Sequence, residues 1–124
     1  METTDLETFL TSKNLKSKSL FFKIDIEGGE YALIPSIKNL LKECDTSLCI
    51  ALHPEFLIES IRNELSGSFK ELKVRWRFYK KHKNLIMSLP YSTIEHADGR
   101  SINLRKNLLK AFLLGKFPHA LVAY

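Results

Sequence analysis

The sequence lacks the features that mark a membrane protein or a secreted one. It contains no run of about 20 apolar residues, which a membrane-spanning helix requires. Its first residues, METTDLETFL, carry acidic side chains and lack the basic start of a signal peptide. We therefore expect a soluble protein and, by default, a cytoplasmic location.

Cysteine and glycine are both scarce. The two cysteines, Cys44 and Cys49, form neither a CxxC motif nor a metal knuckle, and both lie among apolar residues. We expect reduced thiols in the core rather than a disulfide. The five glycines are at 28, 29, 67, 99 and 115, and none of them forms a GxGxG-like nucleotide-binding turn.

Positive charge is present in excess, and it is concentrated in one segment. The net charge is +5, and residues 70–83, KELKVRWRFYKKHK, hold seven basic side chains against a single acidic one, Glu71. Such a segment could attract nucleic acid, an anionic membrane or a phosphorylated substrate. The plainer interpretation is the solvated face of a helix. A chain of 124 residues has room for one domain with one core.

Apolar spacing in the first half of the chain predicts alternating helices and strands. The expected elements are a short helix at 4–10, a strand at 20–26, a helix from Pro35 through Glu43, a strand at 47–52, and a helix that carries Ile61 and ends at Ser66-Gly67-Ser68. Because the apolar run of the strand at 20–26 is continuous, we expect a parallel strand that is covered on both faces.

The second half of the chain predicts a long helix, a hairpin, a helix and a last strand. The long helix ends at Pro90, and its expected core stripe is Phe69, Leu72, Trp76, Tyr79, Lys83 and Ile86. The dipeptide Asp98-Gly99 predicts a hairpin between residues 91–97 and 100–104. A helix at 104–114, with Asn103 as cap and Gly115 as stop, precedes a strand at 120–124.

Charged and polar residues follow the first two predicted strands. The stretch FFKIDIEGGEYALIP turns from an apolar strand into Asp25, Glu27 and Glu30, and His53 follows the next strand. In a parallel α/β sheet, ligands bind outside the carboxyl ends of the strands. Asp25, Glu27 and His53 could therefore face one crevice and accept a proton or position a cofactor.

Each of these residues also has a structural interpretation. Glu27 and Glu30 could stabilise the N-terminus of the next helix, and His53 could simply end a strand before Pro54. Asp25 is harder to explain structurally, because a lone carboxylate inside an apolar strand costs several kcal/mol unless it is paired or opens to a site. We favour a functional role for the group.

The same residues resemble a known family. "FFKIDIEGGEYALI", followed by "IALHPEF", resembles the FkbM family of S-adenosylmethionine-dependent methyltransferases at its fourth strand, typically Ile-Lys-Ile-Asp-Val-Glu-Gly-Ala-Glu. "TTDLETFL" is similar to the segment that precedes that strand. The resemblance implies a partial class I, Rossmann-like methyltransferase sheet in residues 1–124, with parallel strands that end in an antiparallel pair.

The resemblance also implies roles for single residues. Asp25 and Glu27 would lie at the strand end beside the methyl donor and the substrate, and Gly28 would be the permissive turn residue. Glu30 would be the cap after the turn, and His53 the corresponding group on the next strand. Gly29 replaces the family's usual alanine.

One part of the family's pattern is missing. The family binds S-adenosylmethionine mainly through an earlier half, with a glycine-rich turn that this chain lacks. The sequence therefore resembles the C-terminal half of such a domain, with an incomplete cofactor site. We expect it to be inactive alone, and to self-associate or to require the missing N-terminal half, because its first strand would leave an apolar edge unpaired.

Three functional hypotheses remain open. The first is an O-methyltransferase of a small-molecule or glycan hydroxyl, with Asp25 as first candidate base, His53 as second and Glu27 orienting, and with neither a membrane nor a nucleic acid as partner. The second is a non-catalytic binding module that docks an anionic partner on the basic helix. The third makes Asp25, Glu27 and His53 ligands of a divalent metal, since oxygen and nitrogen ligands suit Mg²⁺ or Mn²⁺.

Overall fold

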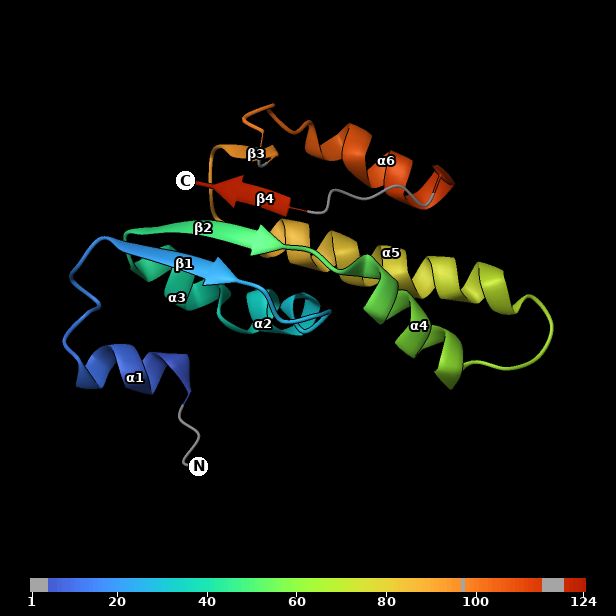
Figure 1. The fold of residues 1–124 in the computed structure, drawn as a ribbon, viewed down its shortest axis with the longest axis horizontal. Helices are drawn as coiled ribbons and strands as arrows, with labels where there is room; N and C mark the ends of the chain where they lie inside the picture. Colours follow the sequence, from blue (N-terminus) through green and yellow to red (C-terminus); the bar gives the residue numbers. More distant parts are fainter. Residues whose placement is uncertain (1–4, 97, 115–119) are drawn as a thin grey trace.

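Helices and strands alternate along most of the chain in the computed structural model, which describes residues 5–96, 98–114 and 120–124 (Figure 1). The elements, in chain order, are α1 (Leu6–Ser12), β1 (Leu20–Ile24), α2 (Glu30–Ser36), α3 (Lys38–Glu43), β2 (Thr46–Ala51), α4 (Pro54–Glu64), α5 (Lys70–Ser88), β3 (Ile94–His96), α6 (Leu104–Leu114) and β4 (Ala120–Ala123). Within the described residues, no helix is long and apolar enough to cross a membrane.

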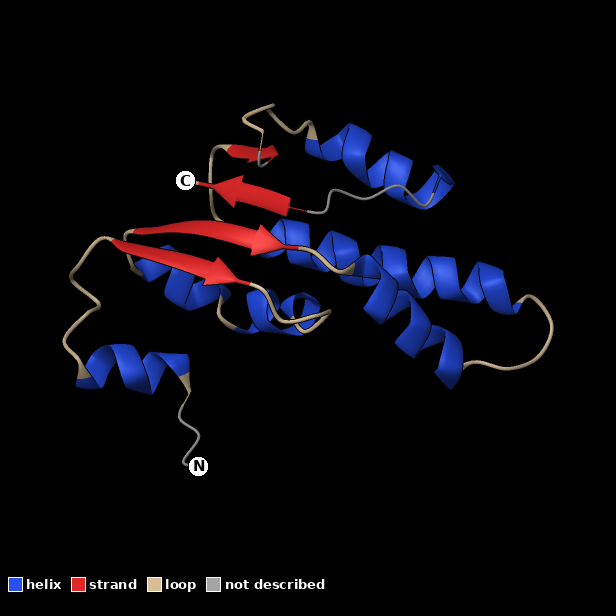
Figure 2. Ribbon diagram, viewed as in Figure 1, coloured by secondary structure: helices blue, strands red, loops and turns tan. Residues whose placement is uncertain are grey.

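The strands form one mixed sheet of order β1-β2-β4-β3. β1 and β2 are parallel, and β4 runs antiparallel to both of its neighbours, β2 and β3. The expected α/β architecture, with parallel strands that end in an antiparallel pair, is confirmed at this level. Figure 2 shows α2, α3 and α5 on one side of this sheet.

Burial across the sheet is one-sided. Leu48 and Ile50 of β2 are fully buried, whereas Ser47 and Cys49, which point to the other face, are only half-buried. On β1 the side chain of Phe21 is 68% exposed. The expectation that this strand is covered on both faces is therefore wrong. The continuous apolar run predicted two covered faces, but Phe21 lies on the outer face of an edge strand rather than in the core.

β1 is an edge strand of the sheet, and no described strand pairs with its outer side. Leu20 donates its backbone N–H to the carbonyl of Asp45 at 2.8 Å, toward β2. Because backbone polar groups alternate in direction along a strand, those of Phe21 and Lys23 point to the open side. Such an edge can pair with another strand.

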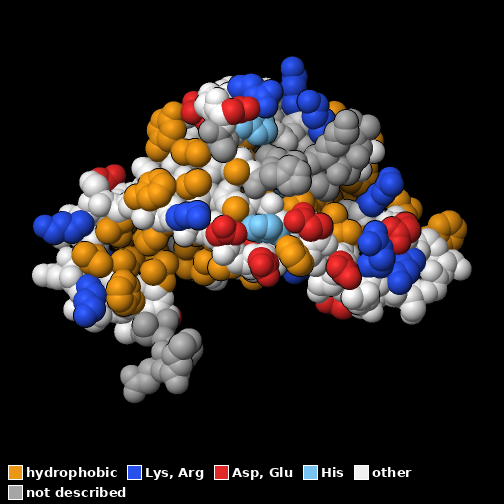
Figure 3. Space-filling model, viewed as in Figure 1, with side chains coloured by type: hydrophobic (Ala, Val, Ile, Leu, Met, Phe, Trp, Pro, Cys, Tyr) orange, Lys and Arg blue, Asp and Glu red, His pale blue; other side chains and the backbone are white. Residues whose placement is uncertain are grey.

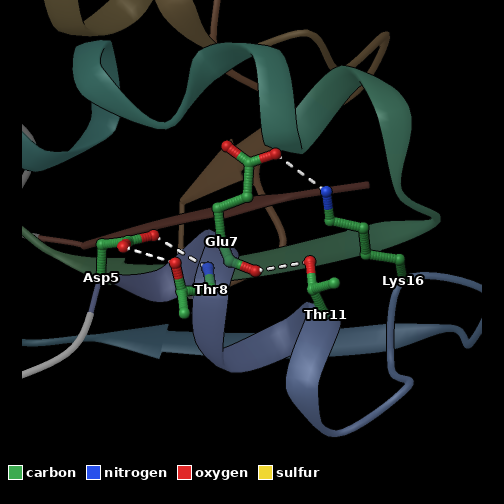
Figure 4. Close-up of polar contacts among 5 residues, drawn as sticks. All are labelled: Asp5, Glu7, Thr8, Thr11 and Lys16. Atoms are coloured by element: carbon green, nitrogen blue, oxygen red, sulfur yellow. Dashed lines mark hydrogen bonds and ion pairs between the residues drawn. The ribbon is translucent and has the colours of Figure 1, made fainter.

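The first two helical predictions are confirmed in part. Asp5 caps α1 and accepts hydrogen bonds from the Thr8 backbone N–H at 2.8 Å and from its hydroxyl at 2.6 Å, while Lys16 pairs with Glu7 at 2.8 Å (Figure 4). The helix expected to start at Pro35 instead starts at Glu30 and divides at Ile37 into α2 and α3. Pro35 lies near the end of α2, where its missing N–H removes a helical hydrogen bond.

The buried face of α5 is not the expected one. Leu72 is 62% exposed and Trp76 is also exposed, so the predicted core stripe is wrong apart from Ile86. α5 buries Val74, Phe78, His82, Leu85, Ile86 and Ser88, and the first four follow one another in steps of three and four. This stripe contains a histidine, a residue type that an apolar pattern does not count. Phe78 stacks on His82 with ring centroids 5.8 Å apart.

The C-terminal elements follow the sequence more closely. The helix at 104–114 is confirmed, and Asn103 Oδ1 accepts the Lys106 backbone N–H at 3.0 Å as its cap; the expected stop at Gly115 lies outside the described residues. A turn at Asp98-Gly99 is present, but among the described residues its second arm joins β3 through one isolated bridge, between Glu95 and Ser101. β3 instead pairs with β4, which offers a longer ladder.

Burial of His82 makes the stability of the fold dependent on pH. Desolvation lowers the pKa of His82 to about 4 from 6.5. Below pH 6.5 the unfolded chain binds a proton there that the folded chain does not, so the free energy of unfolding falls as the pH drops toward 4. The difference between the two pKa values corresponds to a decrease in the free energy of unfolding of at most about 3 kcal/mol. Urea unfolding at several pH values between 7 and 4 measures this decrease.

The control for this prediction is Val74→Ala, a change at another buried position of α5 that removes no titratable group. We expect Val74→Ala to keep the pH dependence and His82→Leu to flatten it. A slope that is unchanged in His82→Leu would contradict the assignment.

Candidate functional site

The carboxyl ends of β1 and β2 bring two of the predicted residues together. The strands pair in parallel, with Ile24 opposite Ile50, so that Asp25 and His53 follow at the same edge. Asp25 Oδ1 lies 3.6 Å from His53 Nε2. Acidic side chains and a histidine gather over this edge of the sheet on the face shown in Figure 3. The two residues can therefore act on one bound molecule.

Asp25 does not lie inside an apolar strand, so the structural cost expected for it is wrong. β1 ends at Ile24, and the Asp25 side chain is 48% exposed, with Lys23 Nζ 3.8 Å from its Oδ2. It is not a carboxylate buried inside a strand, and it carries no large desolvation cost. Its accessibility leaves it open to a bound ligand.

The buried carboxylate of the site is Glu30, which the sequence suggested only as a cap. It is the first residue of α2 and is 0% exposed. Its Oε2 accepts the backbone N–H of Gly28 at 2.8 Å, and its Oε1 accepts the backbone N–H of His53 at 2.7 Å. One side chain thus joins the turn after β1 to the end of β2. Its spacing of four from Ile34 was the available signal, because it places Glu30 on the buried face of α2.

The turn between β1 and α2 uses two left-handed residues, Glu27 with φ 47° and Gly28 with φ 96°. A Cβ on Gly28 would lie 3.2 Å from Phe56 Cβ and 3.5 Å from the Leu57 nitrogen. Glycine therefore both allows this turn and lets it approach the start of α4. Glu27 is exposed, and within the described residues it makes no hydrogen bond or ion pair. The structure does not join it to Asp25 and His53.

The imidazole of His53 lies between two carboxylates. Its Nδ1 is 3.7 Å from Glu30 Oε1, and Nδ1 is buried without a hydrogen-bond partner. Its Nε2 faces Asp25 on the exposed side. The ring also lies near Phe56, with centroids 6.0 Å apart. An imidazole beside an exposed carboxylate can orient a hydroxyl group.

The described residues offer no metal centre. In the parts of the chain that the structure covers, no group of three or more His, Cys, Asp or Glu side chains is placed to hold a metal ion. The geometry therefore gives no support to the hypothesis that Asp25, Glu27 and His53 are metal ligands. The cavities that the described residues line are formed by other residues, and one of them lies between α5 and α6.

Comparison of the chain with protein-family models, with curated proteins and with solved structures finds no match. The interpretation of the site therefore depends on its geometry and on the sequence resemblance.

Replacing Glu30 tests whether its carboxylate holds the site together. In Glu30→Gln one oxygen becomes an amide nitrogen that faces a backbone N–H donor, so a buried hydrogen bond is lost. We expect the free energy of unfolding to fall by about 2–3 kcal/mol. Glu27→Gln, a matched change on an exposed side chain, should alter it by less than about 0.5 kcal/mol. Urea unfolding measures the free energy of unfolding of both variants. Equal decreases would show that the Glu30 carboxylate does not hold the turn and the end of β2 together.

Proposed function

We propose that this chain is the C-terminal half of an S-adenosylmethionine-dependent O-methyltransferase of the FkbM type. The observation that carries the proposal is the pair Asp25 and His53, 3.6 Å apart at the carboxyl ends of adjacent parallel strands. The sheet gives further support, because an antiparallel strand inserted among parallel ones suits the last strands of a class I methyltransferase. The free cysteines suit a reducing compartment, and we propose a cytoplasmic location.

The residues present could line the part of the site where the methyl group is transferred, but they could not hold the whole cofactor. The resemblance implies that Asp25, Glu27 and Gly28 would lie beside the methyl donor. Gly28 and Gly29, however, belong to the turn into α2, and the sequence has no GxGxG-like turn. These residues are too few to hold the nucleoside and the amino acid parts of S-adenosylmethionine. The rest of the cofactor site would come from a partner half that pairs with the open edge of β1.

The chemical task of this chain is to orient the acceptor and take its proton. When bound, S-adenosylmethionine supplies a methyl group whose bond to sulfur breaks as the bond to the acceptor oxygen forms. Asp25, which is exposed, would accept the hydroxyl proton, and His53 would hold the hydroxyl or relay that proton. Glu30 would act only through His53, by fixing its backbone. Glu27 is the weaker candidate, because it makes no contact with the pair.

The first test uses the isolated chain. We expect calorimetric titration with S-adenosylmethionine to give little or no binding, because most of the cofactor site is absent. Sedimentation at several concentrations should show self-association through the β1 edge, where Phe21 is exposed. A clean monomer with micromolar affinity for the cofactor would overturn the half-domain proposal.

A second stage of this test restores the missing half. Joined to the cofactor-binding half of an FkbM methyltransferase, the chain should yield S-adenosylhomocysteine from a hydroxyl acceptor. Asp25→Asn should lower kcat by about 10²-fold or more, because the proton acceptor is lost. The matched control Lys81→Gln, on the exposed face of α5, should leave kcat unaltered. An Asp25→Asn chimera of unchanged kcat would exclude Asp25 as the base.

A second candidate function is a binding module for an anionic partner. The basic residues of 70–83 are largely exposed, as expected for a solvated helix face. Arg77 pairs with Glu64 at 3.4 Å, whereas within the described residues Lys73, Lys80 and Lys81 have no carboxylate partner. These three lysines leave net positive charge on one side of α5.

Salt dependence tests this alternative. Binding of a heparin oligosaccharide should weaken steeply as salt rises, because contact with the lysines releases counterions. Replacing Lys73, Lys80 and Lys81 together by Gln should flatten that dependence, and Arg77→Gln should change it less, because Arg77 is already paired. If the affinity of the unchanged chain for the heparin oligosaccharide does not vary with salt, the binding-module hypothesis is wrong.

A further inference from the structure

The groove between α5 and α6 is a separate feature, away from the strand-end site. It encloses about 480 Å³, within the range typical of small-molecule sites. The described residues that line it are Trp76, Tyr79, Lys83, Leu108, Leu109 and Phe112. Five of these are aromatic or aliphatic, one is a lysine and none is acidic. This composition suits a ligand with an apolar body and a negative group.

Aromatic rings give the groove a defined wall. Trp76 and Tyr79 stack with ring centroids 5.7 Å apart, and Phe112 of α6 meets Tyr79 edge-on at 5.3 Å. Phe112 also meets Trp76 edge-on at 6.1 Å. Rings that pack against one another from two helices hold their positions and leave faces for an apolar chain. Trp76 and Leu109 remain exposed on this side of the molecule.

Charge at the groove is positive and uncompensated. Lys83 lines it, and Lys80 Nζ lies 5.3 Å from the centroid of the Trp76 ring. Within the described residues neither lysine pairs with a carboxylate, whereas Arg62 and Arg77 are neutralised by Glu71 and Glu64. Both lysines are therefore available to an anion.

We propose that the α5–α6 groove binds a soluble amphipathic anion, with a single apolar chain against Trp76, Leu109 and Phe112 and its carboxylate or phosphate group on Lys83. Apolar burial would supply most of the affinity, and the charge-assisted contact would select an anionic head. The proposal does not depend on the methyltransferase hypothesis, because no residue of the groove belongs to the strand-end site.

Trp76 makes the test direct, because it is the one tryptophan of the sequence. Dodecyl phosphate and dodecanoate are titrated below the concentrations at which they form micelles, and Trp76 fluorescence is followed. We expect saturable changes with micromolar dissociation constants for both probes. Dodecanol, which lacks the charge, should bind at least about tenfold more weakly. An unchanged spectrum with both anions would overturn the proposal.

Two lysine variants separate the groove from general electrostatic attraction. Lys83→Gln should weaken dodecyl phosphate about tenfold and leave dodecanol unaffected. Lys38→Gln removes the same charge from an exposed side chain of α3, outside the groove lining, and should have no effect. Equal weakening by the two variants would overturn the proposal.

A third variant tests the apolar wall and the source of the anion. Leu109→Asp, a change on an exposed side chain, should abolish binding of both anionic probes while the melting temperature stays near that of the unchanged chain. The chain should not co-sediment with vesicles of phosphatidylcholine and phosphatidic acid. Sedimentation with vesicles but no response to either soluble probe would indicate a membrane surface and overturn the proposal.

Discussion

The arrangement of the strand ends depends on one buried carboxylate, that of Glu30. It accepts backbone N–H groups from Gly28 and from His53, and so it ties the turn after β1 to the start of α4. A polar group in the interior is tolerated only where hydrogen-bond partners surround it. Because the partners of Glu30 are backbone groups, its side chain fixes the path of the chain rather than the position of another side chain. Asp25 and His53 come within 3.6 Å of each other as a result.

The same tie explains the unusual turn. Glu27 is a non-glycine residue with φ 47°, a conformation that costs of the order of 1–2 kcal/mol. The hydrogen bond from Gly28 to Glu30 closes this turn, and a side chain on Gly28 would press on Phe56. The acidic turn after β1 therefore brings β1, α2 and α4 together. Asp25 and His53 lie at the two ends of this connection.

Sequence reasoning located the elements well and single side chains less well. Periodicity found the strands and α6, because their apolar spacing matches their burial. It placed Asp25 inside a strand that ends one residue earlier, and this difference decides between a buried and an exposed carboxylate. It missed His82 in the core of α5, because histidine counts as polar although its uncharged ring stacks on Phe78. Which of two apolar faces of α5 is buried depends on α2 and the sheet, and local spacing carries no such information.

The open edge of β1 and the strand-end pair belong to one continuous segment. Backbone groups of Phe21 and Lys23 point to the open side, and Asp25 follows in the same alternation. A strand that paired with β1 would lie about 4.8 Å from it and would run alongside Asp25. It would also narrow the space over the Asp25 carboxylate, which is now half-exposed. Pairing at the edge and completion of the crevice are therefore coupled, so that whatever chain fills the edge also shapes the site in which Asp25 and His53 meet their ligand.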